Sequence, residues 1–332
     1  MQLTGAGGRR FLAATAEKGP RHAASSRMTT LIAPKEDRRS SGIAILLFAQ
    51  IFFTTLDTSA KYLSVFGMPT SEIVFVRYGV HVLLMLAVFL PTRGLGLFKS
   101  RNWKLELARG LCLLLITLGN FLSMKFLPLA VTGALMFTMP IMVVALSVPL
   151  LGEKVGLKRW AAVGVGFLGI LIIIRPGTEA FHPASLLCIG GALAAALYTI
   201  ITRKLARVDS AATQQIWSGL IALTAVTPFA FNGWVWPNDG PSWFAFLVIG
   251  VVGMLAHQLN SVALRFAPPS VLAPFSYTEL LMLAMASWLI FNDPPDLWFF
   301  LGAPLIVGSG LFIWLRERQL ARQQASVAAV ED

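Results

Sequence analysis

The sequence predicts an all-α integral membrane protein with ten transmembrane helices, arranged as two inverted five-helix repeats with both termini in the cytoplasm. This prediction depends on an apolar composition, ten apolar segments and an internal repeat. Of the 332 residues, 56% are hydrophobic and 13% are charged, whereas soluble domains average about 25% charged residues. A soluble chain this apolar could not cover its own surface, so a multi-pass membrane protein is the first interpretation.

Ten segments approach the roughly 20 residues that a helix needs to cross a 30 Å hydrocarbon core. Membrane β-strands would alternate apolar and polar residues, and runs such as "GILIII" and "GGALAAALYTII" do not. Helices are therefore expected over residues 42–63, 71–91, 104–125, 129–151, 157–175, 183–204, 211–231, 243–264, 270–291 and 296–315.

The first five segments each carry a feature that needs an explanation. The first contains Asp57, the second Arg77, and the third Arg109, which we expect to reach the membrane interface by snorkelling. Pro140 predicts a kink in the fourth segment. The spacing Ala162–Gly166 in the fifth allows close helix packing.

The second five segments are separated by clear turn signals. "RPG", "NGWVWPNDGP" and "NDPPD" provide Pro, Gly and Asn-Asp pairs, and the tryptophans of the middle stretch are typical of a membrane interface. The run "GGALAAAL" in the sixth segment allows close packing. Pro274 in the ninth can unwind the backbone next to Tyr277 and Glu279.

The chain outside the spans is short. Residues 1–40 are basic, rich in small residues and without a signal-peptide core, which predicts a disordered tail or an extended start with Met28 as the initiator. The first repeat covers residues 41–176 and the second 183–315, and residues 316–332 form a cytoplasmic tail.

Basic residues indicate the orientation of the chain in the membrane. If the N-terminus is cytoplasmic, 17 lysines and arginines lie near the inner surface, and only Lys61, Lys125 and Arg175 near the outer one. Positive charge favours the cytoplasmic side, so both termini are expected inside the cell membrane. Because this placement accounts for most of the net charge of +11, the bilayer is the expected partner and nucleic acid is not.

The chain repeats itself at an offset of 140 residues. "NFLSMKFLPLAVTGAL" (120–135) aligns with "NSVALRFAPPSVLAPF" (260–275), so that Asn120 corresponds to Asn260, and farther along Glu153 corresponds to Asp293. At an offset of 142, Lys61 corresponds to Arg203. Five helices per repeat is an odd number, so the second repeat enters the membrane from the opposite side, an architecture of many secondary transporters.

These features together resemble the EamA family of the drug/metabolite transporter superfamily. The resemblance covers roughly residues 40–320 and rests on "VFVRYGV" early in the second helix, "GEK" after the fourth and "RPG" after the fifth. "NDPP" departs from the Gly-Glu usual after the ninth helix. The resemblance implies a ten-helix bundle around a central cavity, and the movement of small metabolites, often amino acids and commonly as an exporter.

Two carboxyl groups inside the spans are the leading candidates for binding a substrate or a coupling proton. Asp57 lies at a depth similar to that of Arg77, and it either faces a cavity or forms an ion pair with Arg77 or with Lys61 four residues on. Lys61 is expected at the outer surface, where it reaches water without Asp57. Glu279 lies near mid-membrane with no cationic residue in its helix, which suits proton coupling.

Further polar and aromatic residues in the spans are candidate binding residues, with helix packing as the alternative for each. Asn120 and Asn260 occupy equivalent repeat positions, which favours a shared role. The remaining candidates, besides Glu279, Asp57 and Arg77, are His81, Tyr198, Trp217, His257 and Tyr277.

The favoured function is secondary active transport of a small polar metabolite, an amino acid or a related compound, by alternating access with proton coupling or exchange. Vitamin or nucleoside-derivative uptake is the alternative within transport, and a non-transporting scaffold or receptor is the alternative outside it. No P-loop, HExxH or G-x-S-x-G motif is present, so neither an ATP-driven pump nor an enzyme is expected. Cys112 and Cys188 lack metal-ligand spacing, and no cofactor or metal is expected.

Overall fold

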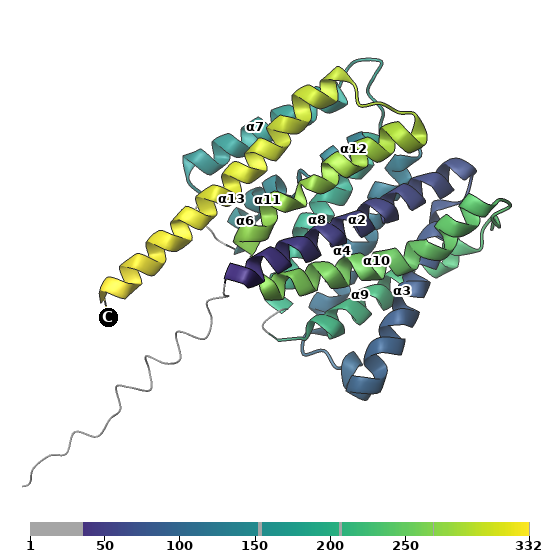
Figure 1. The fold of residues 1–332 in the computed structure, drawn as a ribbon, viewed down its shortest axis with the longest axis horizontal. Coiled ribbons are helices and arrows are strands. Elements are labelled where there is room, and N and C mark those ends of the chain that lie inside the picture. Colours follow the sequence, from purple (N-terminus) through teal and green to yellow (C-terminus); the bar gives the residue numbers. More distant parts are fainter. Residues whose placement is uncertain (1–35, 152–154, 206–207, 268, 332) are drawn as a thin grey trace, which may run out of the picture.

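The computed structural model describes residues 36–151, 155–205, 208–267 and 269–331, and over these residues the chain is a bundle of helices (Figure 1). The first repeat contributes α2 (Glu36–Phe66), α3 (Thr70–Arg93), the 3-10 turn η2 (Gly94–Phe98), α4 (Trp103–Met124), α5 (Leu129–Met136), α6 (Met139–Leu151) and α7 (Leu157–Ile174). The second contributes α8 (Ala184–Leu205), α9 (Ala211–Ala230), α10 (Gly240–Phe266), α11 (Pro269–Ser276), α12 (Thr278–Phe291) and α13 (Leu297–Glu331).

Nine helical segments of the described chain are long and apolar enough to cross a membrane. The helix α9 is not among these nine, although it has 20 residues and packs against α3 and α4. Large apolar side chains such as Phe244, Leu247, Leu289 and Phe300 are exposed on the outside of the bundle. An outer surface of this kind suits lipid, and a tenth span formed by α9 stays a prediction.

Helix boundaries agree with the sequence expectations except at three places. The described part of the predicted tail 1–40 already belongs to α2, which begins at Glu36. The predicted single spans over 129–151 and 270–291 are each divided into two helices. The last helix continues to Glu331, well beyond the expected end at residue 315.

The two divided helices have their interruptions at equivalent positions of the repeat. The first break lies at Phe137 and Thr138 and the second at Tyr277, and an offset of 140 superimposes Phe137 on Tyr277. Pro140 lacks the N–H that would bond the carbonyl of Met136, the last residue of α5. The kink predicted at Pro140 is therefore a full interruption, and the second break follows Pro274 by three residues.

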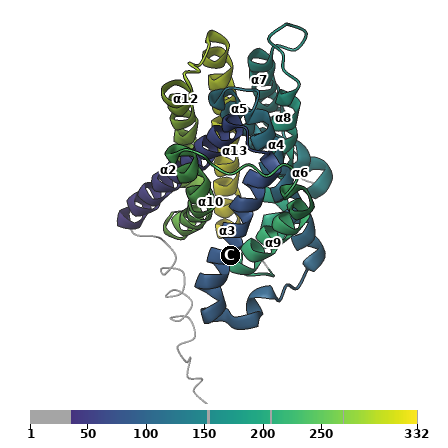
Figure 2. The ribbon, with the colours of Figure 1, turned by 90° about the vertical axis from the view of Figure 1, so that its right-hand side faces the viewer.

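The contacts between helices are nearly unchanged when each helix is replaced by its counterpart in the other repeat. Under the sequence offset α2, α3, α4 and α7 correspond to α8, α9, α10 and α13. The contacts of α2 with α10 and of α3 with α10 are matched by contacts of α8 with α4 and of α9 with α4. The pairs α3–α9 and α7–α13 each join a helix to its own counterpart, so the repeats are interlocked rather than side by side (Figures 1 and 2).

The two ends of the bundle differ in charge. At one end, which we call the basic end, α2 begins, α8 ends and the segments 94–102 and 208–210 meet. At the other, the Lys61 end, residues near Lys61, Leu127, Arg175 and Asp293 meet. Since α2 begins and α8 ends at the basic end, these corresponding helices run in opposite directions, as inverted repeats require.

Candidate functional site

A central cavity of about 630 Å³ lies where the two helix breaks meet α2, α4, α8, α10 and α13. This volume is within the range of about 300–1,000 Å³ that is typical of small-molecule sites. Aromatic and aliphatic side chains form most of its wall, and a few ionisable and amide groups project into it. Inverted-repeat transporters place their substrate sites at such interrupted helices.

The aromatic rings of the two breaks contact one another inside the cavity wall. Phe137 and Tyr277, which are equivalent in the repeat, have ring centroids 5.2 Å apart. The Tyr277 hydroxyl lies against Gly310 of α13, where a Cβ atom would overlap it. The absence of a side chain at Gly310 therefore allows Tyr277 to occupy this position in the wall.

Asp57 lines the cavity from α2, and its Oδ2 accepts a hydrogen bond of 3.3 Å from the Asn120 amide of α4. Neither of the ion pairs considered from the sequence forms, because no cationic group of the described chain lies within 4.0 Å of its carboxylate. The carboxyl group is therefore held by a neutral amide, with Arg77 near enough to act on it electrostatically.

Arg77 is bound by neutral groups rather than by a carboxylate. Its Nη1 donates a 2.7 Å hydrogen bond to Thr117 Oγ1, and the guanidinium lies 5.1 Å and 5.2 Å from the ring centroids of Tyr78 and Phe121. A guanidinium has five N–H donors, and within the described residues only this one side-chain hydrogen bond of Arg77 is seen. The remaining donors are available to a ligand in the cavity.

Glu279 lies in the first turn of α12 and lines the same cavity. Within the part of the chain that is described, its carboxyl group forms neither a hydrogen bond nor an ion pair. The sequence predicted that no cationic residue of its own helix pairs with Glu279, and none of the described residues of the neighbouring helices does so either. The carboxyl of Asp57 is the charged group that acts on it, so the cavity holds two interacting acidic groups from different repeats.

The wall toward the basic end contains Tyr198 and His257. His257 of α10 packs edge-on against Phe53 of α2, with ring centroids 5.0 Å apart. The Tyr198 hydroxyl accepts a hydrogen bond from Arg109, whose guanidinium also lies 4.3 Å from the ring centroid. Tyr198 is therefore held by a residue outside the cavity lining, whereas His257 packs against another ring of the wall.

Seven of the ten candidate residues from the sequence line the cavity, and three do not. His81 is buried between α3 and α9, where it lies against Gly219. Trp217 donates its indole N–H to the Phe98 carbonyl at 3.1 Å and faces a separate apolar groove beside α4. Asn260 is half-buried on α10 away from the cavity wall, so it does not share the position of Asn120 in the site.

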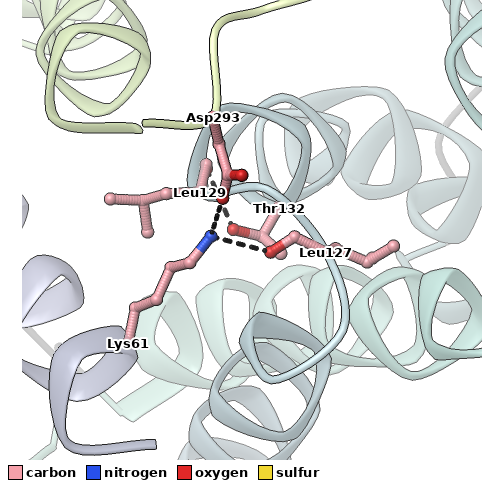
Figure 3. Close-up of polar contacts among 5 residues, drawn as sticks. All are labelled: Lys61, Leu127, Leu129, Thr132 and Asp293. Carbon is pink, nitrogen blue, oxygen red and sulfur yellow. Dashed lines mark hydrogen bonds and ion pairs between the residues drawn. The ribbon is translucent and has the colours of Figure 1, made fainter. Parts of the chain in front are cut away.

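Lys61 corrects the expectation that it reaches water at the outer surface. Its side chain is only 5% exposed, and its Nζ lies 2.8 Å from Asp293 Oδ2 and 3.2 Å from the Leu127 carbonyl oxygen (Figure 3). Asp293 follows α12, and Leu127 precedes α5, so one ammonium group ties α2 to both divided helices. The cavity lies on the basic-end side of this ion pair.

Arg109 is also placed differently from the expectation, since it is 3% exposed and does not snorkel. Besides Tyr198, its guanidinium donates to Thr202 Oγ1, the Gln214 carbonyl and Ser218 Oγ. Arg109 therefore joins α4 of the first repeat to α8 and α9 of the second. The sequence alone did not show which helices surround Arg109.

Several wall residues were not singled out from the sequence. Phe53, Phe121 and Trp314 contribute ring surface, and Thr117 holds Arg77. The repeat offers a signal for two of the missed residues, because Thr117 is equivalent to His257 and Phe137 to Tyr277 at the offset of 140. The described residues contain no group of three or more His, Cys, Asp or Glu arranged for a metal ion. The "GEK" motif, including Glu153, lies outside the described residues.

Comparison with known proteins places this geometry among transporters. The model of the EamA-like transporter family matches residues 40–175 and 182–315, which are the two repeats. A riboflavin transporter of Vibrio cholerae is 31% identical over 86% of this chain and 97% of its own length. An S-adenosylmethionine uptake transporter of Rickettsia bellii is 27% identical over 84% and 95%, respectively.

Two further matches agree with these. A pseudopaline exporter of Pseudomonas aeruginosa is 26% identical over 82% of this chain and 95% of its own. One crystal structure superimposes with a TM-score of 0.57 and 20% identity over 85% of this chain and 99% of that chain. At that identity the structural match concerns the fold alone.

Proposed function

Since the chain belongs to the EamA-like transporter family, we propose that it takes up a nitrogen-heteroaromatic metabolite of the vitamin or nucleoside-derivative class. The general function is established: the chain is a multi-pass inner-membrane protein whose family and named relatives transport small molecules. The substrate class, the direction and the mechanism are our proposal.

The composition of the cavity wall is the observation that carries the substrate class. Riboflavin and the adenosyl group both combine a fused nitrogen ring system with a hydroxylated carbon chain or sugar. Ring surfaces of Phe53, Phe137 and Tyr277 suit the faces of such a ring. Asp57, Asn120 and Arg77 suit the hydrogen-bonding groups at its edge and on its chain.

An amino-acid substrate, the expectation drawn from the family resemblance, receives less support. Much of the wall of the 630 Å³ cavity is aromatic or aliphatic, and a small amino acid would leave this surface uncovered. The relatives described above are named for riboflavin, S-adenosylmethionine and pseudopaline. Uptake is proposed because the S-adenosylmethionine relative is named as an uptake transporter.

We propose alternating access as the mechanism, with the cavity facing the basic end in the present state. The Lys61–Asp293 ion pair then closes the opposite end, and its opening would admit substrate from outside. Asp57 and Glu279 are proposed to hold the coupling proton between them, because both carboxyl groups lie in the cavity without an ion-pair partner in the described chain.

Thermal unfolding of the purified protein tests the substrate class, because a ligand that binds only the folded state raises its midpoint. We expect riboflavin or an adenosyl compound to raise the melting temperature in a concentration-dependent manner, and free amino acids to leave it unchanged. The Phe53→Ala variant should lose the shift, and Leu289→Ala, which changes an exposed outer residue, should keep it. Stabilisation by amino acids alone would contradict the proposed class.

A further inference from the structure

A second pocket lies at the basic end, away from the central cavity. It has a volume of about 630 Å³ and is formed where the segment after α3 meets the turn between α8 and α9. Its lining includes Arg93, Lys99 and Arg101 from the first repeat, and Asp209, Ser210 and Thr213 from the second. We call it the Arg93 pocket.

The charge of the Arg93 pocket is positive and incompletely neutralised. It contains three cationic side chains and one carboxylate, and the Asp209 oxygens already accept hydrogen bonds from Ser100 Oγ at 2.6 Å and from the Arg101 amide at 2.9 Å. Arg93 Nη1 donates to Ser210 Oγ at 2.9 Å. Lys99 and Arg101 are exposed, and their side chains pair with no carboxylate in the described chain.

The depth of the pocket matches that of lipid headgroups. The apolar span that contains α3 ends at Phe98, between the lining residues Gly96 and Lys99. Beside it, Leu95 and Trp103 are 76% and 55% exposed, and amphipathic Trp is typical of the interface between hydrocarbon and water. Basic pockets at this level are suited to anionic headgroups.

Membrane orientation alone explains why basic residues occur at this end, but not why three of them surround one cavity. Lys158 at the start of α7 and Lys204 near the end of α8 are also exposed at the basic end, and neither lines the Arg93 pocket. The convergence of Arg93, Lys99 and Arg101 thus separates a binding arrangement from scattered topogenic charge.

We propose that the Arg93 pocket binds a phosphate-bearing anion at the membrane surface. Arg93, Lys99 and Arg101 provide the charge. The hydroxyls of Ser210 and Thr213 are hydrogen-bonded to each other, so one of the two retains a hydrogen that can be donated to the anion. Because the pocket is built from both repeats, an anion there links them at the basic end. The proposal is independent of the molecule carried through the central cavity.

Two sources of the phosphate group are distinguished by titrating the purified protein in detergent, with thermal unfolding as the readout. One arm uses phosphatidylglycerol against phosphatidylcholine in mixed micelles, and the other uses inorganic phosphate against chloride at equal ionic strength. Selective stabilisation by phosphatidylglycerol identifies a lipid headgroup, and stabilisation by inorganic phosphate as well identifies a site for the free anion. Stabilisation by neither overturns the proposal.

The variant Lys99→Gln/Arg101→Gln should weaken the apparent affinity by about fivefold for each cation removed, which is typical of basic groups at an anionic surface. Its matched control is Lys158→Gln/Lys204→Gln, which removes the same charge from the same end and should keep the affinity of the unchanged protein. Equal weakening in both variants indicates a general charge effect and overturns the pocket. Should the first variant be poorly folded, Lys99→Gln alone, with phosphatidylglycerol retention measured by native mass spectrometry, gives the same test.

Discussion

Glu279 and Asp57 bring one carboxyl group from each repeat into the same cavity. Asp57 is held by the Asn120 amide, and Glu279 is without a bonding partner in the described chain. An ionisable carboxyl group inside the membrane is energetically costly, so its presence there is an indication of function. Proton binding during transport is the role that this arrangement suits best.

We expect Glu279→Gln to lower uptake driven by a proton gradient by at least about tenfold, which corresponds to roughly 1.4 kcal/mol. Exchange of substrate across vesicles without a gradient should continue, because the amide retains the shape of the side chain. Reconstituted vesicles with and without an imposed gradient provide the measurement. Glu179→Gln, the same change at an exposed loop position, is the control. Equal loss of gradient-driven uptake and exchange would contradict a specific role in coupling.

Gly310 is expected to determine substrate affinity through Tyr277. In Gly310→Ala the new Cβ overlaps the Tyr277 hydroxyl, so the ring must leave its place in the wall and the Michaelis constant should rise about tenfold. Removing the hydroxyl in Gly310→Ala/Tyr277→Phe should recover most of that loss. Gly308→Ala lies in open space on the same helix and should have little effect. An unaltered Michaelis constant in Gly310→Ala would show that Tyr277 is not held in this way.

For single residues, the sequence predicted which side chains lie within the membrane spans better than it predicted whether they face the cavity. Asp57, Arg77 and Glu279 were found because an ionisable group in an apolar run is visible in one sequence. His81 and Trp217 were found in apolar runs in the same way but face other helices, and a single sequence does not contain the rotation of each helix against its neighbours. Lys61 and Asp293 are 232 positions apart, so their ion pair could not be predicted either.

The divided helices α5–α6 and α11–α12 are the elements that build the site. Pro140 and Pro274 indicated them in the sequence, although the predicted kink at Pro140 is an interruption in the structure. Both breaks reach the cavity, where Phe137 and Tyr277 are in contact. Their ends near Leu127 and Asp293 are held by Lys61, and the proposed mechanism assigns closure of the Lys61 end to this ion pair.

Lys61→Gln should destabilise this closure, since it leaves Asp293 without its cation. Breaking a fully buried pair costs about 3–5 kcal/mol. Because Asp293 is 43% exposed, we expect a smaller loss of about 1–3 kcal/mol, close to the value of a hydrogen bond to a charged group. Arg175→Gln breaks the more exposed pair with Asp296 and should cost at most about 1 kcal/mol. Unfolding of both variants in denaturant measures these two losses of free energy of unfolding. Equal losses would argue against a special role for Lys61.

The charge-reversed variant Lys61→Asp/Asp293→Lys separates the ion pair from the individual residues. It should recover part of the stability lost in Lys61→Gln, because an opposite-charge pair can form again between the same elements. A double variant that is less stable than either single variant would indicate that the Leu127 carbonyl, which also binds Lys61, is the main partner.

The whole molecule has a two-fold arrangement that the sequence repeat already indicated. An offset of 140 predicted which helices correspond, and contacts between corresponding pairs follow it. The functional groups do not follow the same symmetry. Asp57 corresponds to Thr199 at the offset of 142, and Glu279 corresponds to Met139 at the offset of 140. The ionisable groups of the cavity are therefore arranged asymmetrically, although the helices around them have a nearly two-fold arrangement.

Both termini and the segment 94–102 are predicted to face the cytoplasm, because basic residues gather at that end. Single cysteines, introduced into a chain lacking Cys112 and Cys188, test this by labelling intact cells with a membrane-impermeant reagent. Labelling is expected at Thr178 and Asn238, which lie in segments toward the Lys61 end, and not at Lys99 or Arg316. The reverse labelling pattern would show that the chain has the opposite orientation in the membrane, with the Arg93 pocket on the outer side.

The central claim is tested most directly by substrate uptake into proteoliposomes that contain the purified chain. Labelled riboflavin and an adenosyl compound are offered beside a panel of amino acids. The account predicts saturable uptake of a heteroaromatic substrate that is lost in Asp57→Asn/Glu279→Gln and kept in Glu179→Gln. Transport of amino acids alone, or an unchanged rate in the doubly neutralised variant, would contradict it.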